Sequence, residues 1–335
     1  MVVEEPRYMV LYKSGGLASR ARELEARLRS CDICPRECGV NRLAGETGFC
    51  HSGYLPIVAA VCAHRGEEPA ISGERGSGTI FFGNCNLRCA YCQNHQISQN
   101  YRAQSRNQVD HRTLAGYMLY LQDELGCHNI NLVSPSHFVP QIVSALLEAV
   151  PMGLRVPLVY NTSSYDSIDT LRALEGIISV YLVDLRYASN KWGKKLSQVS
   201  DYVERARGAI KEMYRQVGNL VVDEGGVAQR GLIVRHLILP SGMAGSRESL
   251  DWLANEVSSS VAVSVMAQYY PAHRALKIPS LARKITGREY EEVVGLLDEL
   301  GIENGWVQEM DAPDTYRPDF AREGHPFETA VSRRK

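Results

Sequence analysis

From residue 78 onward, short apolar runs alternate with longer amphipathic segments, and this alternation constrains the fold more than any other feature. Six runs have the length and composition of strands: residues 78–82, 129–133, 156–160, 180–185, 232–239 and 261–270. Five segments between them carry apolar residues at three- and four-residue steps, which is typical of helices: residues 114–125, 139–150, 167–177, 203–217 and 248–257. Asp110 and Ser246 are placed to act as helix N-caps. The pattern predicts an α/β fold with a parallel sheet built from right-handed βαβ units.

The apolar runs offer no polar face, as expected of parallel strands that are covered on both sides. Six such strands fit a doubly wound sheet or an open, partial barrel. In both architectures the carboxyl ends of the strands form the functional edge. Asn161 and Asp184 lie at such ends in this sequence, as do the residues of the segment 134–137. These positions are therefore candidate site residues.

Seven of the nine cysteines fall in two tight groups. The first group is Cys31, Cys34, Cys38 and Cys50, and the second is Cys85, Cys89 and Cys92. Disulfide frameworks belong to small secreted domains, whereas the N-terminal residues here carry acids and no apolar signal-peptide stretch. We therefore expect the grouped thiols to bind metal. The isolated Cys62 and Cys127 are expected to be small buried hydrophobic residues.

The two groups differ in the number of cysteines, and this number determines which metal sites each group can form. Three cysteines leave a [4Fe–4S] cluster with one iron unligated, where a substrate or cofactor can bind. A mononuclear zinc site would need a fourth ligand. The four cysteines of the first group suffice for a closed site, and either zinc or a fully ligated iron–sulfur cluster fits them.

The second group resembles a known fingerprint. Cys85-x3-Cys89-x2-Cys92, with Tyr91 directly before the last cysteine, resembles the motif of the radical S-adenosylmethionine (radical SAM) superfamily. Residues 180–187 and 233–241 are similar to the aspartate and arginine strands of glycyl-radical-enzyme activases. The stretches 31–50, 67–73, 76–94 and 266–273 together resemble the uncharacterised branch described as pyruvate formate-lyase activating enzyme-like proteins.

This resemblance implies a partial (β/α)6 TIM-like barrel with a small N-terminal cysteine-rich metal module. The expected boundaries are residues 1–66 for an N-terminal helix and the module, 67–285 for the barrel, and 286–335 for a C-terminal helix and wrapping tail. It further implies a [4Fe–4S] cluster on Cys85, Cys89 and Cys92, with S-adenosylmethionine chelating the open iron. An electron from the reduced cluster would cleave the cofactor to methionine and a 5′-deoxyadenosyl radical, which abstracts hydrogen.

The cofactor is expected to lie across the carboxyl ends of the strands. Its expected contacts are Tyr91, Ser134 or Ser136, Asn161, Asp184 and Arg235. The activases carry a glycine-glycine-glutamate stretch where this chain has Ser134-Pro135-Ser136-His137, and an aspartate-x-lysine where it has Asp184-x-Arg186. Arg235 is a permanent cation in an apolar run and needs an anionic partner. Either the cofactor's carboxylate or a salt bridge, for example to Asp184, would supply one.

The expected substrate is a polypeptide, for example a glycine of a partner enzyme, and the expected electron donor is a protein such as ferredoxin or flavodoxin. The sequence assigns no catalytic residue. A net charge of −1 gives no overall attraction to nucleic acid or anionic lipid, and no apolar stretch has the length of a membrane span. We therefore expect a cytoplasmic protein with neither membrane nor nucleic-acid partners.

Two alternatives stay open. A radical SAM enzyme with the same fingerprint can act on a small metabolite or nucleoside. The other alternative is a non-catalytic iron–sulfur electron carrier or a zinc-stabilised binding protein. Three thiolates favour an enzyme and four favour a carrier. The pair Glu67 and Glu68, beside Pro69, is typical of a solvated turn, although its position before the first strand keeps a site role open.

Overall fold

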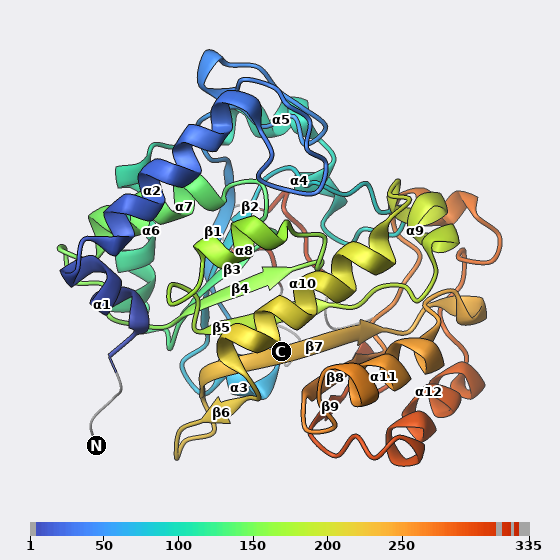
Figure 1. Cartoon of the computed structure of the whole chain (residues 1–335). Helices are drawn as coiled ribbons and strands as arrows, with labels where there is room; N and C mark the ends of the chain where they lie inside the picture. Colours follow the sequence, from blue (N-terminus) through green and yellow to red (C-terminus); the bar gives the residue numbers. More distant parts are fainter. Residues whose placement is uncertain (1–4, 313–316, 323–324, 328–335) are drawn as a thin grey trace.

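A mostly parallel sheet forms the centre of the protein (Figure 1). The computed structural model describes residues 5–312, 317–322 and 325–327. The parallel strands are β2 (Ser77–Phe82), β3 (Ile130–Val133), β4 (Leu158–Thr162), β5 (Val180–Asp184), β7 (Ala228–Leu237) and β8 (Ala262–Met266). They lie side by side in chain order. The six predicted strands are therefore confirmed, and the fold is α/β.

Three further strands extend this sheet. β1 (Val58–His64) runs antiparallel to β2 at one edge, and β9 (Gly305–Val307) runs parallel to β8 at the other. The short β6 (Val221–Val222) pairs antiparallel with the start of β7. The apolar segment that contains β1 was not predicted to be a strand, because only its pairing with β2 distinguishes it from other apolar runs.

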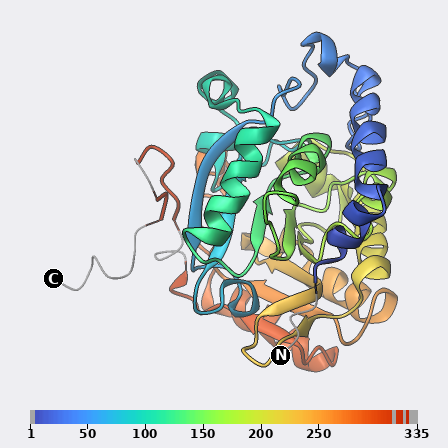
Figure 2. The same ribbon diagram turned by 90° about the vertical axis from the view of Figure 1, so that its left-hand side faces the viewer.

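Helices connect the parallel strands. They are α6 (His111–Asp123), α7 (Val139–Ala149), α8 (Ile168–Ala173), α10 (Tyr202–Val217) and α11 (Ser246–Glu256), followed by α12 (Gly287–Glu299). Near the N-terminus, α1 (Arg7–Lys13) and α2 (Gly16–Ala26) run along the outside of the helical layer (Figure 2). The other helices are α3 (Pro69–Ser72), α4 (His95–Ser98), α5 (Tyr101–Gln104) and α9 (Asn190–Ser197). Single 3-10 turns are η1 (Arg27–Ser30), η2 (Arg42–Ala44), η3 (Ser105–Asn107), η4 (Pro240–Gly242) and η5 (His273–Lys277).

One of the two predicted N-caps is confirmed. The Asp110 carboxylate accepts a hydrogen bond from the Thr113 backbone N–H over 2.7 Å at the start of α6. The prediction for Ser246 was wrong, because Ser246 is the first residue of α11 and Gly245 caps the helix. The Ser246 hydroxyl instead lies 2.9 Å from Nε2 of His236.

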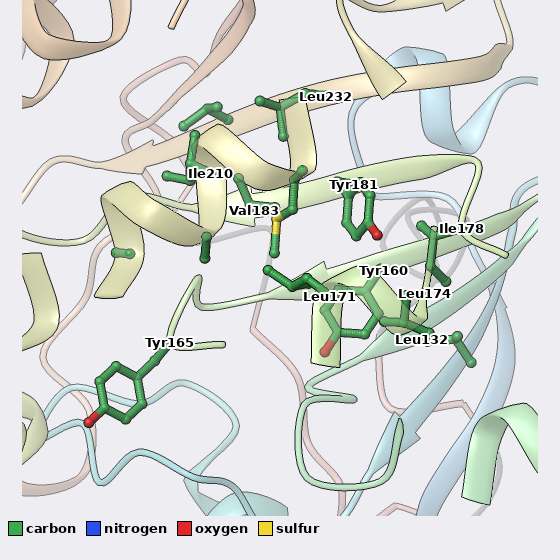
Figure 3. Packing of buried hydrophobic residues seen from close by; sticks show 14 of the residues in the cluster. Leu132, Tyr160, Tyr165, Leu171, Leu174, Ile178, Tyr181, Val183, Ile210 and Leu232 are labelled. Carbon is green, nitrogen blue, oxygen red and sulfur yellow. The ribbon is translucent and has the colours of Figure 1, made fainter. Parts of the chain in front are cut away.

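The two faces of the sheet have different partners, because successive side chains of a strand point to opposite sides. On the outer face, Tyr160, Tyr181 and Val183 pack among helix residues such as Leu171 and Ile210 (Figure 3). On the inner face, α3 packs against a second apolar cluster that includes Val159, Leu182 and Ile233. The helices therefore cover one face of the sheet, while the inner face is closed at one end by α3. Polar side chains follow toward the carboxyl ends of the strands.

Candidate functional site

The three cysteines of the second group lie in the loop that follows β2. They line one cavity together with Ser134, Asn161, Asp184 and Arg235, four of the residues that the sequence places at the functional edge. The loop is anchored through its backbone: the N–H groups of Arg88 and Ala90 donate to carbonyl oxygens at the end of α9. All nine cysteines lie in the described segments and are free thiols.

Each of the three sulfur atoms has a hydrogen-bonding neighbour. The backbone N–H of Leu87 donates to Sγ of Cys85 over 3.4 Å. Sγ of Cys89 is 3.0 Å from the Ser197 hydroxyl, and Sγ of Cys92 is 3.2 Å from the Ser98 hydroxyl.

Burial raises the pKa of Cys85 to about 12 and also raises that of Cys92. A raised pKa favours the protonated form of these two thiols, and a metal bound there would replace their protons. A buried thiol at Cys89 and two partly buried thiols at Cys85 and Cys92, each with a hydrogen-bonding neighbour at sulfur, fit the ligand set of an iron–sulfur cluster.

The number of thiols in the loop bears on the kind of metal site that it can form. Across residues 5–312, 317–322 and 325–327, no three His, Cys, Asp or Glu side chains converge as ligands of one ion. Ligands of a [4Fe–4S] cluster bind different irons, so their sulfurs need not converge on a point. Three thiols can ligate three of the four irons of such a cluster, and they are one ligand short of a structural zinc site.

A network of charged side chains occupies the inner face below the cysteine loop. Nε of Arg235 donates to Asp184 over 2.8 Å, and the two other guanidinium nitrogens donate to Glu67 and Asn161 over 3.2 and 2.7 Å. Asp184 accepts a second hydrogen bond from Arg186 over 2.5 Å. The salt bridge between Arg235 and Asp184 is thus present, and a cofactor carboxylate at Arg235 would share the guanidinium with these partners.

The expectation of a solvated turn at Glu67 and Glu68 was wrong. Glu68 as a whole residue is 7% exposed, and the Glu67 side chain is 10% exposed. The Glu67 carboxylate also accepts from Nδ2 of Asn131 over 3.1 Å. Burial raises the pKa of both carboxyl groups, while Arg235 lowers it. These acids are buried because α3 inserts its apolar side chains into the inner face directly after them.

Arg186 also belongs to this site, although it was not among the expected contacts. It lines the cavity of the cysteines and an adjoining cavity. One of its terminal nitrogens pairs with Asp184, whereas its buried Nε has no hydrogen-bond partner among the described residues. A buried N–H without an acceptor is unfavourable. A ligand that carries a hydrogen-bond acceptor would satisfy it.

The two candidate serines after β3 have different surroundings. Ser134 lines the cavity and adopts a left-handed backbone conformation with φ of 57°. Ser136 is 3% exposed, and its hydroxyl lies 3.1 Å from that of Thr162, in a buried layer that also holds Asp166. The Ser136 side chain is thus occupied by protein partners, and Ser134 is the serine that faces the cavity.

The adjoining cavity widens the site toward the C-terminal segment. It shares Cys92, Asn161, Asp184, Arg186 and Arg235 with the first cavity. Its other lining residues include His64, Glu67, Tyr91, Met266, Gln268 and Phe327. Of these, His64 and Phe327 carried no signal in the sequence, because they reach the cavity from an edge strand and from the C-terminal tail.

The four cysteines of the first group also lie close together. Burial raises the pKa of Cys34 and of Cys38, and the neighbouring cysteines of the group raise both further. Gly48 lies against this group, since a Cβ there would overlap Sγ of Cys38. The four thiols thus lie near one another, although among the described residues their sulfur atoms do not converge as ligands of one ion.

The N-terminal module packs directly against the cysteine loop of the candidate site. Arg36 donates to the carbonyl oxygen of Asn86 over 3.0 Å, and its guanidinium lies 3.6 Å from the ring centre of Phe49. The buried Arg42 donates to the carbonyl oxygen of His137 over 2.7 Å, which ties the module to the loop after β3. The two cysteine groups are therefore neighbours in space.

Comparisons with known proteins add a relative of unknown activity. No family model matches the sequence. An uncharacterised protein of Methanocaldococcus jannaschii is 28% identical over 282 residues, which cover 82% of this chain and 76% of the relative. Among the described residues, no helix combines the length and apolar character needed to cross a membrane.

Proposed function

We propose that the protein is a radical SAM enzyme that abstracts hydrogen from a polypeptide, in the manner of glycyl-radical-enzyme activases. The observation that carries this proposal is the single cavity shared by Cys85, Cys89 and Cys92 with Ser134, Asn161, Asp184 and Arg235. The spacing of these cysteines matches the radical SAM fingerprint, and they supply three ligands to a cluster that has four irons. When bound, such a cluster supplies the electron that cleaves S-adenosylmethionine into methionine and a 5′-deoxyadenosyl radical.

The charges around the cavity support binding of this cofactor. S-adenosylmethionine carries a sulfonium, an ammonium and a carboxylate group. Glu67 and Asp184 place two carboxyl groups beside the two guanidinium groups of Arg186 and Arg235, so groups of both signs line the cavities where the cofactor's charges would lie. The unpaired Nε of Arg186 is a suitable donor for the carboxylate. Asn161 and Ser134 would add uncharged contacts, and Tyr91 would shield the cluster.

The fold and the state of the cysteines support two finer parts of the proposal. Parallel strands that follow chain order, with their long helices on one face, favour an open, partial (β/α)6 barrel over a doubly wound sheet. Nine free thiols favour the reducing cytoplasm. We propose that a small redox protein such as ferredoxin or flavodoxin supplies the electron there.

Anaerobic reconstitution with iron and sulfide, followed by dithionite and S-adenosylmethionine, tests this function. We expect 5′-deoxyadenosine from the wild-type protein and none from the triple variant Cys85→Ala, Cys89→Ala, Cys92→Ala. The matched control replaces the isolated Cys62 and Cys127 by alanine and should keep the activity. A wild-type protein that binds its cluster and forms no 5′-deoxyadenosine would instead be an electron carrier.

A further inference from the structure

A chain of buried hydroxyl groups connects Cys89 to Tyr91 behind the cysteine loop. Sγ of Cys89 lies 3.0 Å from the hydroxyl of Ser197, the last residue of α9. The Ser197 hydroxyl lies 2.7 Å from that of Tyr187, which in turn lies 2.7 Å from that of Tyr91. None of the four side chains is more than 6% exposed. Water is therefore excluded from most of this chain.

Metal ligation at Cys89 would fix the direction of every hydrogen bond in the chain. A ligating cysteine is a thiolate, which can only accept hydrogen bonds. Ser197 must then donate its one hydroxyl proton to the sulfur, so Ser197 can only accept from Tyr187. Tyr187 has likewise used its proton, so it accepts from Tyr91. All three hydroxyl protons point toward the sulfur.

We propose that Ser197, Tyr187 and Tyr91 form a directed hydrogen-bond relay that raises the reduction potential of the cluster held by Cys89. The proposal rests on the proposed function, because it requires a cluster at this cysteine. Reduction adds one negative charge to a cluster, and a donor at a ligating sulfur stabilises the reduced form more than the oxidised form. A buried chain of aligned hydroxyl groups strengthens its terminal hydrogen bond through mutual polarisation.

The donor at Cys89 differs from the donors at the other two sulfur atoms. Cys85 and Cys92 receive theirs from Leu87 and Ser98, which lie within a few residues of the cysteine along the chain. Ser197 comes from a separate helix, 108 residues away in sequence. It is also the only one of these donors that receives a hydrogen bond from a buried tyrosine in the described part of the chain. Ser197, Tyr187 and Tyr91 are thus positioning residues that act on the cluster through Cys89.

The backbone holds α9 against the cysteine loop independently of these hydroxyl groups. The N–H of Ala90 donates to the carbonyl oxygen of Leu196 over 2.7 Å, and the N–H of Arg88 donates to that of Ser197 over 3.3 Å. Removal of the Ser197 or Tyr187 hydroxyl leaves both hydrogen bonds in place. Substitution of these side chains therefore alters the hydrogen bonding at Sγ of Cys89 without detaching α9 from the cysteine loop.

Potentiometric titration of the reconstituted protein, monitored by electron paramagnetic resonance, tests the relay. We expect Ser197→Ala to shift the midpoint potential to more negative values and Tyr187→Phe to shift it less in the same direction. Iron content should stay at the wild-type level. The matched control is Tyr181→Phe, which removes another fully buried tyrosine hydroxyl, bonded to Gln216 over 2.7 Å. Its midpoint should equal that of wild type, and Ser197→Thr should restore the wild-type value.

The outcomes separate the relay from the proposed function. If the wild-type protein binds no iron at these cysteines, both are overturned. If a cluster binds and Ser197→Ala leaves its midpoint unchanged, the relay alone is overturned. If the Ser197→Ala protein loses its iron, the Tyr187→Phe protein is the test, because it keeps the Ser197 hydroxyl at Cys89. A wild-type midpoint potential in the Tyr187→Phe protein would then overturn the relay.

Discussion

Asp184 and Arg235 are register partners on the neighbouring parallel strands β5 and β7, and Nε of Arg235 donates to Oδ1 of Asp184 over 2.8 Å. Their side chains are 11% and 15% exposed. The same guanidinium holds Glu67, which arrives from the loop before α3. Arg235 therefore pairs with two acids that lie far apart in sequence. We expect this pairing to stabilise the inner face of the sheet.

Replacement of this arginine should be costly to the fold. Arg235→Met leaves the carboxylates of Asp184 and Glu67 without their shared cation, and loss of one partner from a buried ion pair costs about 3–5 kcal/mol. We expect a decrease of that size in the free energy of unfolding, measured by urea denaturation. Arg247→Met is the control, since Arg247 is 59% exposed and pairs with Glu299, which is 57% exposed. Surface pairs contribute about 0–1 kcal/mol, so equal effects of the two substitutions would contradict this account.

The N-terminal cysteines should hold their metal independently of the cysteine loop. In the triple variant Cys85→Ala, Cys89→Ala, Cys92→Ala, the four thiols of the first group remain. We expect elemental analysis of this variant to find about one zinc per chain, or else residual iron with sulfide. The absence of both metals would show that the N-terminal module is not a metal site.

Gly48 offers a way to disturb the N-terminal site alone. A Cβ at this position would overlap Sγ of Cys38, so Gly48→Ala should displace that thiol and reduce the metal content of the N-terminal module. The iron bound by Cys85, Cys89 and Cys92 should remain. Gly53→Ala is the matched control, because a Cβ there meets no atom within 4 Å. Full metal content in the Gly48→Ala protein would refute the assignment.

Much of this architecture follows from local sequence patterns. The apolar runs locate the six parallel strands, and the alternation of side chains along a strand places Asn161, Asp184 and Arg235 where they can meet on one face. The fingerprint spacing brings three cysteines to the same edge. These features depend on residues near one another in sequence, which is why the sequence predicts them.

The parts that were missed depend on contacts between distant segments. The composition around Glu67 is that of a surface turn, and only the insertion of α3 against the inner face buries it. The choice between Ser134 and Ser136 depends on the left-handed backbone of Ser134. A hydroxyl partner for Cys89 requires α9 to lie against the cysteine loop, and nothing near Ser197 in the sequence indicates this contact.

A buried histidine should make the protein sensitive to mild acid. His236 is fully buried between the Leu185 carbonyl oxygen, 2.8 Å from Nδ1, and the Ser246 hydroxyl, 2.9 Å from Nε2. Burial lowers the pKa of His236 to about 4. In the unfolded chain a histidine titrates near pH 6.5, about where an unperturbed imidazole does. Below that pH the unfolded state binds a proton that the folded state does not bind until about pH 4.

The free energy of unfolding should therefore fall as the pH drops from about 6.5 to 4, by about 2–3 kcal/mol from this residue. His236→Gln removes the titrating ring, so the decline measured by urea denaturation across this range should be shallower. Some decline should remain, because burial also lowers the pKa of His64 to about 4 and that of His137 to about 3. Ser246→Ala keeps the ring and should keep the steeper decline. An identical pH dependence in wild type and His236→Gln would exclude His236 as the acid-sensitive group.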